Sequence, residues 1–307
     1  MGDCMKELQN ILLKKDDLFS DIYGQEIVKR QLRSALLTER HVIIVGPPGV
    51  GKTTLAKNLA DTLKIKNFVR IQGSPDLTAE DLLGDIDPIK AMKYGPLSLE
   101  AFTKGKIFKA DNGILFFDEL NRCPEKLQNA LLQVLSEKKA TIGSYDVDFD
   151  LNFIFIGTMN PEDSSTEKLS DVLLDRFDLI YMSYPESTEI EKKIIKTKGA
   201  KLDVEFPERL MTVVVDFIHD LRSDEKLEKK PSVRASLGLY ERAQANALLK
   251  GKKSVSFTEV EEAVVSVLSH RISLKPSVKY LQDTRQYARD RLSKFVEKTD
   301  ADRGDLL

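Results

Sequence analysis

A glycine-rich segment carries the most specific chemical pattern in the sequence. Residues 46–53 match the pattern G-x-x-x-x-G-K-[ST] and lie between an apolar strand pattern and a helical one. Glycine lets successive backbone N–H groups point at phosphate oxygens, and a helix N-terminus adds its positive dipole end. Lys52 is expected to reach the β- and γ-phosphates, and the Thr53 hydroxyl to ligate Mg²⁺. The predicted nucleotide-binding residues here are Gly46, Pro47, Pro48, Gly49, Val50, Gly51, Lys52, Thr53 and Thr54.

Two adjacent carboxylates follow an apolar segment in the middle of the chain. Residues 114–117 read ILFF, and Asp118 and Glu119 come directly after them. If this strand ends beside the glycine-rich loop, Asp118 can hold a hydrated magnesium ion while Glu119 polarises water for in-line attack on the γ-phosphate. The two segments predict an enzyme that hydrolyses ATP to ADP and phosphate with Mg²⁺. ATP is favoured over GTP because the sequence contains no Asn-Lys-x-Asp guanine-reading element.

A third polar residue follows the next apolar segment. Residues 152–156 have a strand pattern, and the segment GTMNP comes directly after them. An Asn before Pro is by itself typical of a turn. At the tip of a strand beside Asp118, however, the Asn160 side chain would reach between Glu119 and the γ-phosphate. The three segments together therefore predict that Asn160 orients the attacking water.

The elements that must position these residues alternate in type along the first part of the chain. Short β-branched or aromatic segments predict strands, several of them buried on both faces, at 41–45, 67–72, 113–117, 152–156 and 179–182. Helical patterns lie at 27–38, 53–63 and 124–137. This alternation predicts an α/β core of three layers with a parallel sheet.

Helical patterns dominate the rest of the chain. They lie at 188–198, 207–222, 232–250, 258–271 and 277–297. Thr188 with Glu191, and Thr258 with Glu261, have the spacing of capping boxes. The predicted organisation is a nucleotide-binding core over residues 1–185 and a smaller, all-helical lid domain with a C-terminal helix over residues 186–307.

Five ordered motifs resemble those of AAA+ ATPases. They are the glycine-rich segment at 46–53, FDELNR at 117–122, GTMNP at 157–161, LLDRF at 173–177 and PSVRA at 231–235. Within that superfamily the chain is similar to the MoxR group and to the related ATPase subunit of magnesium chelatase. The resemblance covers about residues 20–290, which is nearly the whole sequence.

The resemblance implies roles for three residues. Asn160 matches sensor 1, and Arg234 matches sensor 2, which the helical lid contributes to the γ-phosphate. Arg176 matches the arginine finger, which enters the ATP site of the adjacent subunit in such rings. A guanidinium acting in this way can raise the rate by roughly 10³–10⁵. The plainer interpretations are a surface ion pair for Arg176, with Asp175 or Asp178, and a helix-surface position for Arg234.

Three further residues match the family, two before the first helix and one after the acidic pair. Tyr23 and Gly24 lie in the segment IYGQ, which resembles the segment that packs near adenine before the first helix. Arg122 fits the family pattern that contains Asp118 and Glu119, but the pattern assigns it no role.

The resemblance also implies two insertions and a ring. The stretch from Gly73 to Ile114 is far longer than one crossover helix needs, so a helix-2 insert is expected at about 87–108. The alternating residues within 138–151 predict a β-hairpin before sensor 1. The protein is expected to form a homo-oligomeric ring, with a hexamer favoured and Arg176 acting in trans.

Two classes of partner are compatible with these motifs. One is a protein client, for instance with a von Willebrand A-like domain, which ATP turnover would remodel or whose metal cofactor or complex it would help to mature. The alternative is a nucleic-acid motor of the RuvB or replicative-helicase type. The hairpin tip carries Asp146, Asp148 and Asp150 and no Lys or Arg, which disfavours contact with a phosphate backbone. A third class, a non-hydrolysing scaffold, would be expected to lack Glu119 or Arg176.

Composition excludes several other functions. The 47 Lys and Arg residues nearly balance the 49 Asp and Glu residues, so the net charge of −2 creates no overall attraction to nucleic acid or membrane. No apolar run approaches the length of a bilayer span, and the N-terminus lacks a signal-peptide core, which predicts a cytoplasmic protein. The 2 cysteines and 3 histidines are scattered and are expected to be structural.

Overall fold

The computed structural model describes residues 3–14, 18–63, 67–95, 98–137, 139–142, 145–161, 168–280 and 282–303. Side chains are described in these ranges except at 3–8, 99, 139–149 and 299–303. The chain divides into two compact units, Met1–Ser183 and Tyr184–Leu307. No helix among the described residues is both long and apolar enough to cross a membrane.

Five parallel strands form the sheet of the first unit. In their order across the sheet they are β2 (Phe68–Gln72), β5 (Gly113–Asp118), β8 (Phe153–Met159), β1 (Val42–Val45) and β9 (Asp178–Tyr181). Because all neighbouring pairs run parallel, the carboxyl ends of the strands meet at one edge of the sheet. The predicted α/β core with a parallel sheet is confirmed, although β8 continues to Met159 rather than ending at residue 156.

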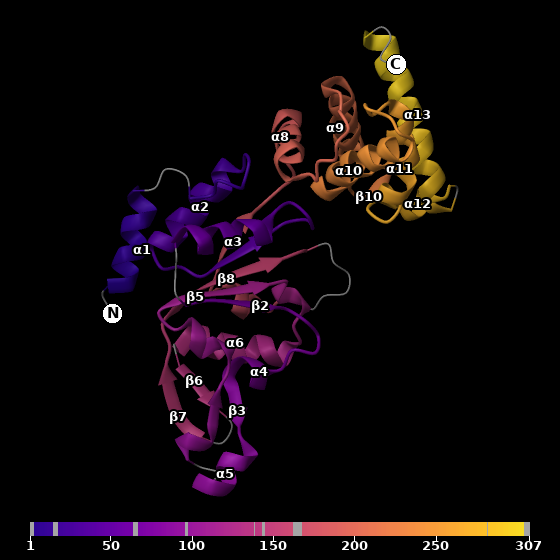
Figure 1. Cartoon of the computed structure of the whole chain (residues 1–307). Coiled ribbons are helices and arrows are strands. Elements are labelled where there is room, and N and C mark those ends of the chain that lie inside the picture. Colours follow the sequence, from indigo (N-terminus) through magenta and orange to yellow (C-terminus); the bar gives the residue numbers. More distant parts are fainter. Residues whose placement is uncertain are drawn as a thin grey trace. The chain divides into compact units, whose positions relative to one another are not determined.

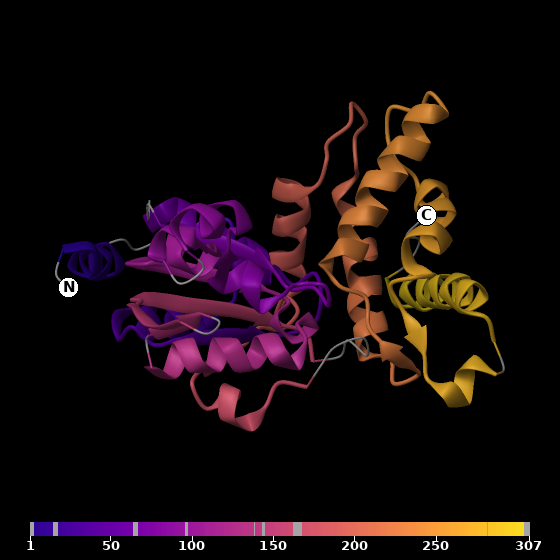
Figure 2. The ribbon, with the colours of Figure 1, turned by 90° about the horizontal axis from the view of Figure 1, so that it is seen from below.

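Helices cover both faces of this sheet. Helices α2 (Glu26–Leu37) and α3 (Lys52–Leu63) pack on one face, and α6 (Glu125–Glu137) packs on the other (Figures 1 and 2). Alternate side chains of β1 enter the two clusters, as the period of two in a strand requires. Helix α1 (Asp3–Lys14), which the sequence patterns did not predict, adds Leu12 to the cluster that contains α2.

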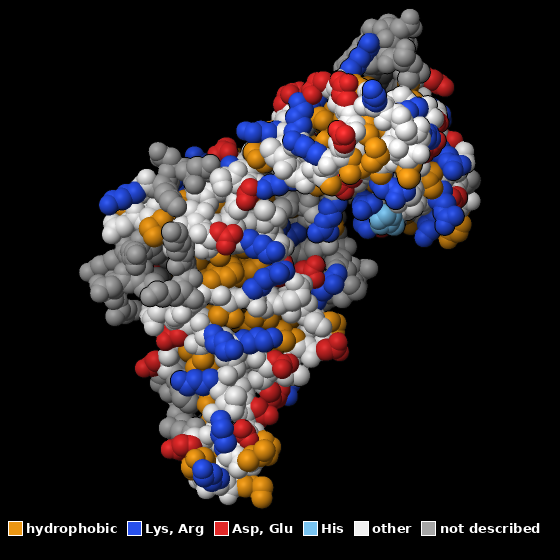
Figure 3. Space-filling view, viewed as in Figure 1, with side chains coloured by type: hydrophobic (Ala, Val, Ile, Leu, Met, Phe, Trp, Pro, Cys, Tyr) orange, Lys and Arg blue, Asp and Glu red, His pale blue; other side chains and the backbone are white. Residues whose placement is uncertain are grey.

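Two antiparallel hairpins project from this core. Strands β3 (Gly84–Ile86) and β4 (Phe102–Lys104) pair, with the short helix α5 (Pro88–Tyr94) between them and α4 (Ala79–Leu83) before them. Figure 3 shows hydrophobic side chains beside lysines at the tip that carries α5, where Ile89 is 81% and Met92 91% exposed. The short 3₁₀ turns of the first unit are η1 (Leu99–Ala101), η2 (Lys106–Ala110) and η3 (Leu120–Arg122).

The second hairpin consists of β6 (Lys139–Ile142) and β7 (Tyr145–Asp150), which pair antiparallel within the stretch where a hairpin was predicted. The side chains of Asp146 and Asp148, on which the argument against DNA partly depended, lie outside the described residues. The short helix α7 (Asp171–Leu174) precedes β9.

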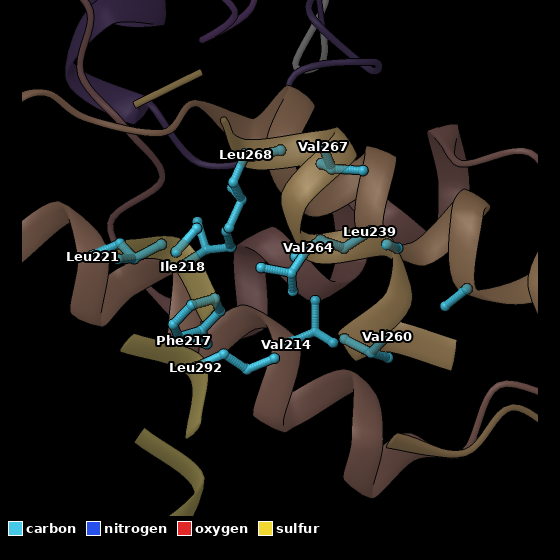
Figure 4. Packing of buried hydrophobic residues seen from close by; sticks show 14 of the residues in the cluster. Val214, Phe217, Ile218, Leu221, Leu239, Val260, Val264, Val267, Leu268 and Leu292 are labelled. Carbon is cyan, nitrogen blue, oxygen red and sulfur yellow. The ribbon is translucent and has the colours of Figure 1, made fainter. Parts of the chain in front are cut away.

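The second unit is built from helices around a large apolar cluster, with a smaller cluster of Ile195, Met211, Val215 and Tyr240. Its longer helices are α8 (Thr188–Lys198), α9 (Glu208–Ser223), α10 (Val233–Leu249), α11 (Phe257–Leu268) and α13 (Thr284–Arg303). Figure 4 shows how Phe217 and Ile218 of α9 meet Val264 of α11 and Leu292 of α13 in this cluster. A two-stranded sheet of β10 (Leu227–Lys229) and β11 (Ser273–Leu274) was not predicted from the sequence.

Three details of the helical prediction were wrong. The N-cap of α8 is Ser187, whose Oγ accepts from the Ile190 N–H, so Thr188 lies inside the helix. The capping box of α11 is formed by Ser256 and Glu259, two residues before the predicted pair. The predicted helix at 277–297 is interrupted, because α12 (Pro276–Lys279) ends before α13 begins. In the first two cases a serine preceded the predicted threonine and supplied the cap.

A buried ionic network links three helices of the second unit. The Glu191 carboxylate of α8 is fully buried and accepts hydrogen bonds from both terminal nitrogens of Arg222, at 2.6 and 2.8 Å. His219 lies 2.8 Å from the same carboxylate, and the Ser236 hydroxyl of α10 also donates to it. Glu191 is therefore a structural residue of the packed interior, rather than part of a helix cap.

Candidate active site

The glycine-rich loop joins the carboxyl end of β1 to the first turn of α3. Gly49 and Gly51 have φ angles of 75° and 108°, which L-residues with a side chain rarely adopt. A Cβ on Gly46 would lie 2.1 Å from the Met182 carbonyl oxygen, so a side chain there would clash with backbone. The sequence therefore needs glycine at these positions in order to curl the backbone around the start of α3.

Lys52 and Thr53 occupy the first turn of α3, directly after this loop. The Lys52 amine donates to the carbonyl oxygens of Gly46 and Pro47 at 2.6 and 2.8 Å, so it lies over the loop. The Thr53 hydroxyl lies 3.1 and 3.2 Å from the two carboxylate oxygens of Asp118. The structure thus brings together the two segments that the sequence analysis assigned to phosphate and to magnesium.

Asp118 is the last residue of β5, and its side chain is only 7% exposed. Its Oδ1 accepts from the Thr158 hydroxyl at 2.7 Å, and its Oδ2 accepts from Arg70 Nη2 at 2.8 Å. Among the described residues no group of three or more His, Cys, Asp or Glu side chains is placed to hold a metal. One carboxylate and one hydroxyl are nevertheless the donors that suit Mg²⁺, which takes its remaining ligands from water and phosphates.

Glu119 adopts a strained backbone conformation directly after the strand. Its φ and ψ are 56° and 51°, in the left-handed region, which costs about 1–3 kcal/mol for a non-glycine residue. Its N–H donates to the Thr158 hydroxyl at 2.9 Å, so Thr158 holds both acidic residues. The Glu119 carboxylate accepts from Gln72 Nε2 at 2.9 Å and lies 3.3 Å from Arg122 Nη1. With 41% of its side chain exposed, Glu119 can reach water.

Asn160 lies one residue beyond β8 and therefore at the same edge of the sheet. Strand β8 pairs with β5 in a register that places Gly157 opposite Phe117. The Asn160 carbonyl accepts from Asn121 Nδ2 at 2.9 Å, which ties the loop after β8 to the loop that begins at Glu119. The structure therefore places Asn160 at the edge of the sheet where the acidic pair lies, and its role in orienting water stays a prediction.

Tyr23 and Gly24 precede α2 and lie near the glycine-rich loop. The preceding Asp21 and Asn58 of α3 exchange two hydrogen bonds, at 2.8 and 2.9 Å. Gly24 has a φ angle of 67°, so the chain turns sharply there before the helix. Ile22 also reaches the loop, since its Cδ1 lies 3.8 Å from the position of a Cβ built on Gly51. These contacts place the segment beside the glycine-rich loop and α3.

Arg176 is not brought to the nucleotide loop of its own chain. It precedes β9, whose first residue Asp178 lies opposite Val42 at the start of β1, whereas the loop follows the other end of β1. The two ends of β1, Val42 and Val45, are three residue steps and so roughly 10 Å apart. The Arg176 guanidinium instead contacts Ser136 Oγ at 3.1 Å and Asp175 at 3.4 Å. The surface pair with Asp175 is present, while Asp178 pairs with Arg40 at 2.8 Å.

Arg234 lies in the second unit, in the first turn of α10, and its side chain is exposed. Its role as sensor 2 stays a prediction.

Three residues of the site were missed in the sequence analysis. Arg70 and Gln72 extend from the edge strand β2, and Thr158 extends from β8. The available signal was the alternation of polar Arg70 and Gln72 around Ile71, because alternate residues of a strand share a face. Recognising Arg70 and Gln72 as site residues also required the strand order, which places β2 beside β5.

The cysteine near this site has no reactive character. Cys123 is buried, and its burial raises the pKa of the thiol to about 11. A thiol with that pKa is protonated at neutral pH and a poor nucleophile.

Comparison with known families agrees with this architecture. Residues 41–177 match the AAA domain of the dynein-related subfamily, and residues 220–289 match an AAA lid domain. The chain is 30% identical over 284 residues to the chaperone MoxR1 of Mycobacterium tuberculosis, covering 82% of this chain and 73% of that protein. The chain therefore belongs to the AAA+ ATPases, and within them to the MoxR group.

Other relatives extend this comparison. YeaC of Bacillus subtilis is 29% identical, with 80% of this chain and 82% of that protein covered. The magnesium-chelatase 38 kDa subunit of Chlorobaculum parvum is 25% identical, with 84% and 92% covered. The RuvB Holliday junction branch migration motor of Thermotoga maritima superposes with a TM-score of 0.52 at 21% identity, covering 84% and 74%. That last likeness reflects the shared fold alone.

Proposed function

We propose that this chain hydrolyses ATP to ADP and phosphate in a Mg²⁺-dependent reaction at the carboxyl edge of its sheet. The observation that carries this proposal is the contact of Thr53, in the loop-helix segment, with Asp118 at 3.1 Å, directly beside Glu119. This contact joins a phosphate-binding loop to a carboxylate pair. Membership of the AAA+ ATPases supports the same reaction.

The residues divide the chemistry in the following way. The loop N–H groups and Lys52 bind the phosphates. Thr53 and Asp118 would hold a magnesium ion, which would supply positive charge beside the phosphates. Glu119 accepts a proton from the attacking water, and Asn160 orients that water.

Tyr23 and Gly24 contact the adenine side of the nucleotide. By its match to sensor 2, Arg234 would act on the γ-phosphate.

The active site is completed by a second copy of the chain. Arg176 supports this part of the proposal, because it lies at the opposite edge of the sheet from the nucleotide loop of its own chain. A guanidinium that cannot reach its own site can still act in the neighbour's site when the copies are arranged head to tail in a ring. A hexamer is the proposed assembly.

The work driven by ATP is the remodelling or maturation of a protein client. The name of MoxR1, a chaperone, supports a protein as the partner, and the magnesium-chelatase relatives suggest a client whose metal cofactor is being assembled. A client with a von Willebrand A-like domain fits this class. The exposed Ile89 and Met92 at the tip of α5 offer apolar contact area to such a partner.

Measurement of phosphate release by the purified chain tests the proposed reaction. We expect hydrolysis that requires Mg²⁺, is abolished in Lys52→Ala and does not change when DNA is added. Lys57→Ala is the matched control, because it removes an exposed lysine from the same helix. Absence of ATP turnover in the assembled protein would contradict the reaction, and strong stimulation by DNA would favour a nucleic-acid motor.

A further inference from the structure

Asp118 forms an ion pair with Arg70 of strand β2. The Arg70 Nη2 lies 2.8 Å from Asp118 Oδ2, and the same nitrogen lies 3.3 Å from the Gln72 side-chain oxygen. The Asp118 side chain is almost fully buried, whereas 42% of the Arg70 side chain is exposed. The guanidinium therefore has room to leave, while the carboxylate is fixed in place.

The sheet register explains why this contact forms. Strand β2 is the edge strand beside β5, and Gln72 lies opposite Asp118 in the parallel ladder. Arg70 is two residues earlier and so projects from the same face of β2 as Gln72. A long side chain from that position spans the remaining distance to the end of β5. The contact is built into the strand pairing and does not depend on a flexible loop.

The partners of Asp118 already occupy both of its oxygens. Oδ1 accepts from Thr158 and Thr53, and Oδ2 accepts from Thr53 and Arg70. Thr158 and Thr53 are neutral donors that can remain beside a cation. Arg70 carries a full positive charge, so a divalent ion at the Asp118–Thr53 pair would be repelled by it across a few ångströms. Only the exposed guanidinium can relieve this repulsion, by turning outward into water.

The same guanidinium is connected to the second carboxylate of the site. Arg70 donates to the Gln72 oxygen, and the Gln72 amide donates to Glu119 Oε2 at 2.9 Å. Movement of Arg70 away from Asp118 therefore also removes one partner from the amide that holds Glu119.

We propose that Arg70 competes with magnesium for Asp118 and so sets the magnesium concentration at which the site takes up ATP. The inference rests on the proposed function, because it assigns a regulator to the same nucleotide site. Arg70 is a positioning residue that acts through Asp118. Its removal should strengthen the dependence of nucleotide affinity on magnesium, whereas loss of a purely supporting residue would weaken it.

The test is a comparison of nucleotide affinity with and without magnesium. The dissociation constant of a fluorescent ATP analogue is measured in EDTA and in graded Mg²⁺, and the ratio of the two limiting values gives the coupling between ion and nucleotide. For Arg70→Gln we expect this ratio to rise by about tenfold and the half-saturating Mg²⁺ concentration to fall. Arg70→Lys retains the charge and should stay close to wild type.

The matched control is Arg122→Gln. It removes the same charge from the same acidic pair, but Arg122 contacts Glu119 rather than Asp118 among the recorded ion pairs. We expect its coupling ratio to stay within about twofold of wild type. Circular dichroism and thermal unfolding establish that each variant folds, and Arg70→Met replaces Arg70→Gln if the glutamine variant does not.

The outcomes separate this inference from the function on which it rests. If the wild-type protein does not bind the analogue more tightly with Mg²⁺, the proposed function fails and this inference fails with it. If the wild type shows the coupling but Arg70→Gln leaves the ratio unchanged or lowers it, only the competition is wrong. An equal rise in Arg70→Gln and Arg122→Gln would also contradict it, since that result would reflect net charge alone.

Discussion

Two acidic centres among the described residues differ in character: a closed centre at Glu191 in the second unit, and an open centre at Asp118 and Glu119 in the first. Glu191 in the second unit is fully buried and receives hydrogen bonds from Arg222, His219 and Ser236. Asp118 and Glu119 in the first unit lie at an open edge of a sheet, and the Glu119 side chain is 41% exposed. Each centre binds an arginine. Only the first-unit centre leaves a carboxylate accessible to water.

The difference lies in how firmly the partners are fixed. Burial by itself would raise the pKa of Glu191, but the hydrogen bonds from His219, Arg222 and Ser236 outweigh burial and lower the pKa to about 2. All of these partners come from the same packed unit, so the network is closed and stabilises the fold. At the other centre, Arg70 and Arg122 are each about two-fifths exposed, and Glu119 has a strained backbone. Such partners can exchange with an ion, a nucleotide or another chain.

The largest expected effect tests whether the open centre takes a group from another copy. Lys52→Ala and Arg176→Ala should each lose roughly 10³-fold or more of the ATPase rate. Mixed together, they should regain part of it, because some sites then combine an intact loop with an intact arginine. Phosphate release by the mixture is the measurement. Arg40→Ala is the control, since Arg40 pairs with Asp178 on the surface.

Lack of recovery in mixtures shown to co-assemble would mean that the open centre is complete within one chain.

Substitutions in the closed centre should lower the free energy of unfolding and leave the ATPase chemistry of the first unit unchanged. Glu191→Ala leaves Arg222 buried without its partner, and we expect a loss of about 3–5 kcal/mol in the free energy of unfolding. Lys196→Ala on the same helix, where about half or more of each side chain in the pair with Glu208 is exposed, should change it by less than about 0.5 kcal/mol. Urea denaturation of both variants measures the difference. Similar small effects in both would show that the network is not closed.

Protonation of Glu191 in the closed centre should make the stability of the protein depend on pH. Because the folded pKa of Glu191 is about 2 and an unfolded glutamate titrates near 4.3, its contribution is fully present above about pH 5. It is lost progressively as the pH falls towards 2, by about 3 kcal/mol in total. Unfolding curves between pH 6 and pH 3 measure this slope, with pH values chosen across the titration range. In Glu191→Gln the slope should be shallower, and an unchanged slope would assign it to other groups.

The smallest expected effect concerns the helix caps of the second unit. Ser187→Ala and Ser256→Ala should each cost about 1 kcal/mol of stability, because each removes an acceptor for a helix N–H. Thr188→Ala and Thr258→Ala should cost less, since neither threonine is the N-cap. Thermal unfolding of the four variants ranks them. A larger loss in the two threonine variants would instead assign the N-caps to Thr188 and Thr258.

Most of the fold was predictable because it depends on local patterns. Apolar segments bounded by turn residues predicted the strands of the sheet, and the motifs placed Asp118 and Thr53 in one site. Arg70 was not predicted, because its role depends on which strand lies beside β5, and strand order is set by packing along the whole chain. The caps were misplaced for a different reason, since two hydroxyl residues near each helix start can both serve. Three-residue spacing alone does not choose between them.

The most direct test of the open acidic centre is the Glu119→Gln variant. The change preserves the shape of the side chain and removes its ability to accept a proton, so ATP binding should persist while turnover falls by about 10²–10⁴-fold. Equilibrium binding and phosphate release are measured on the same assembled protein. Retained binding with lost turnover is the predicted result. Turnover close to that of the wild type would contradict the assignment of Glu119 as the base that activates water.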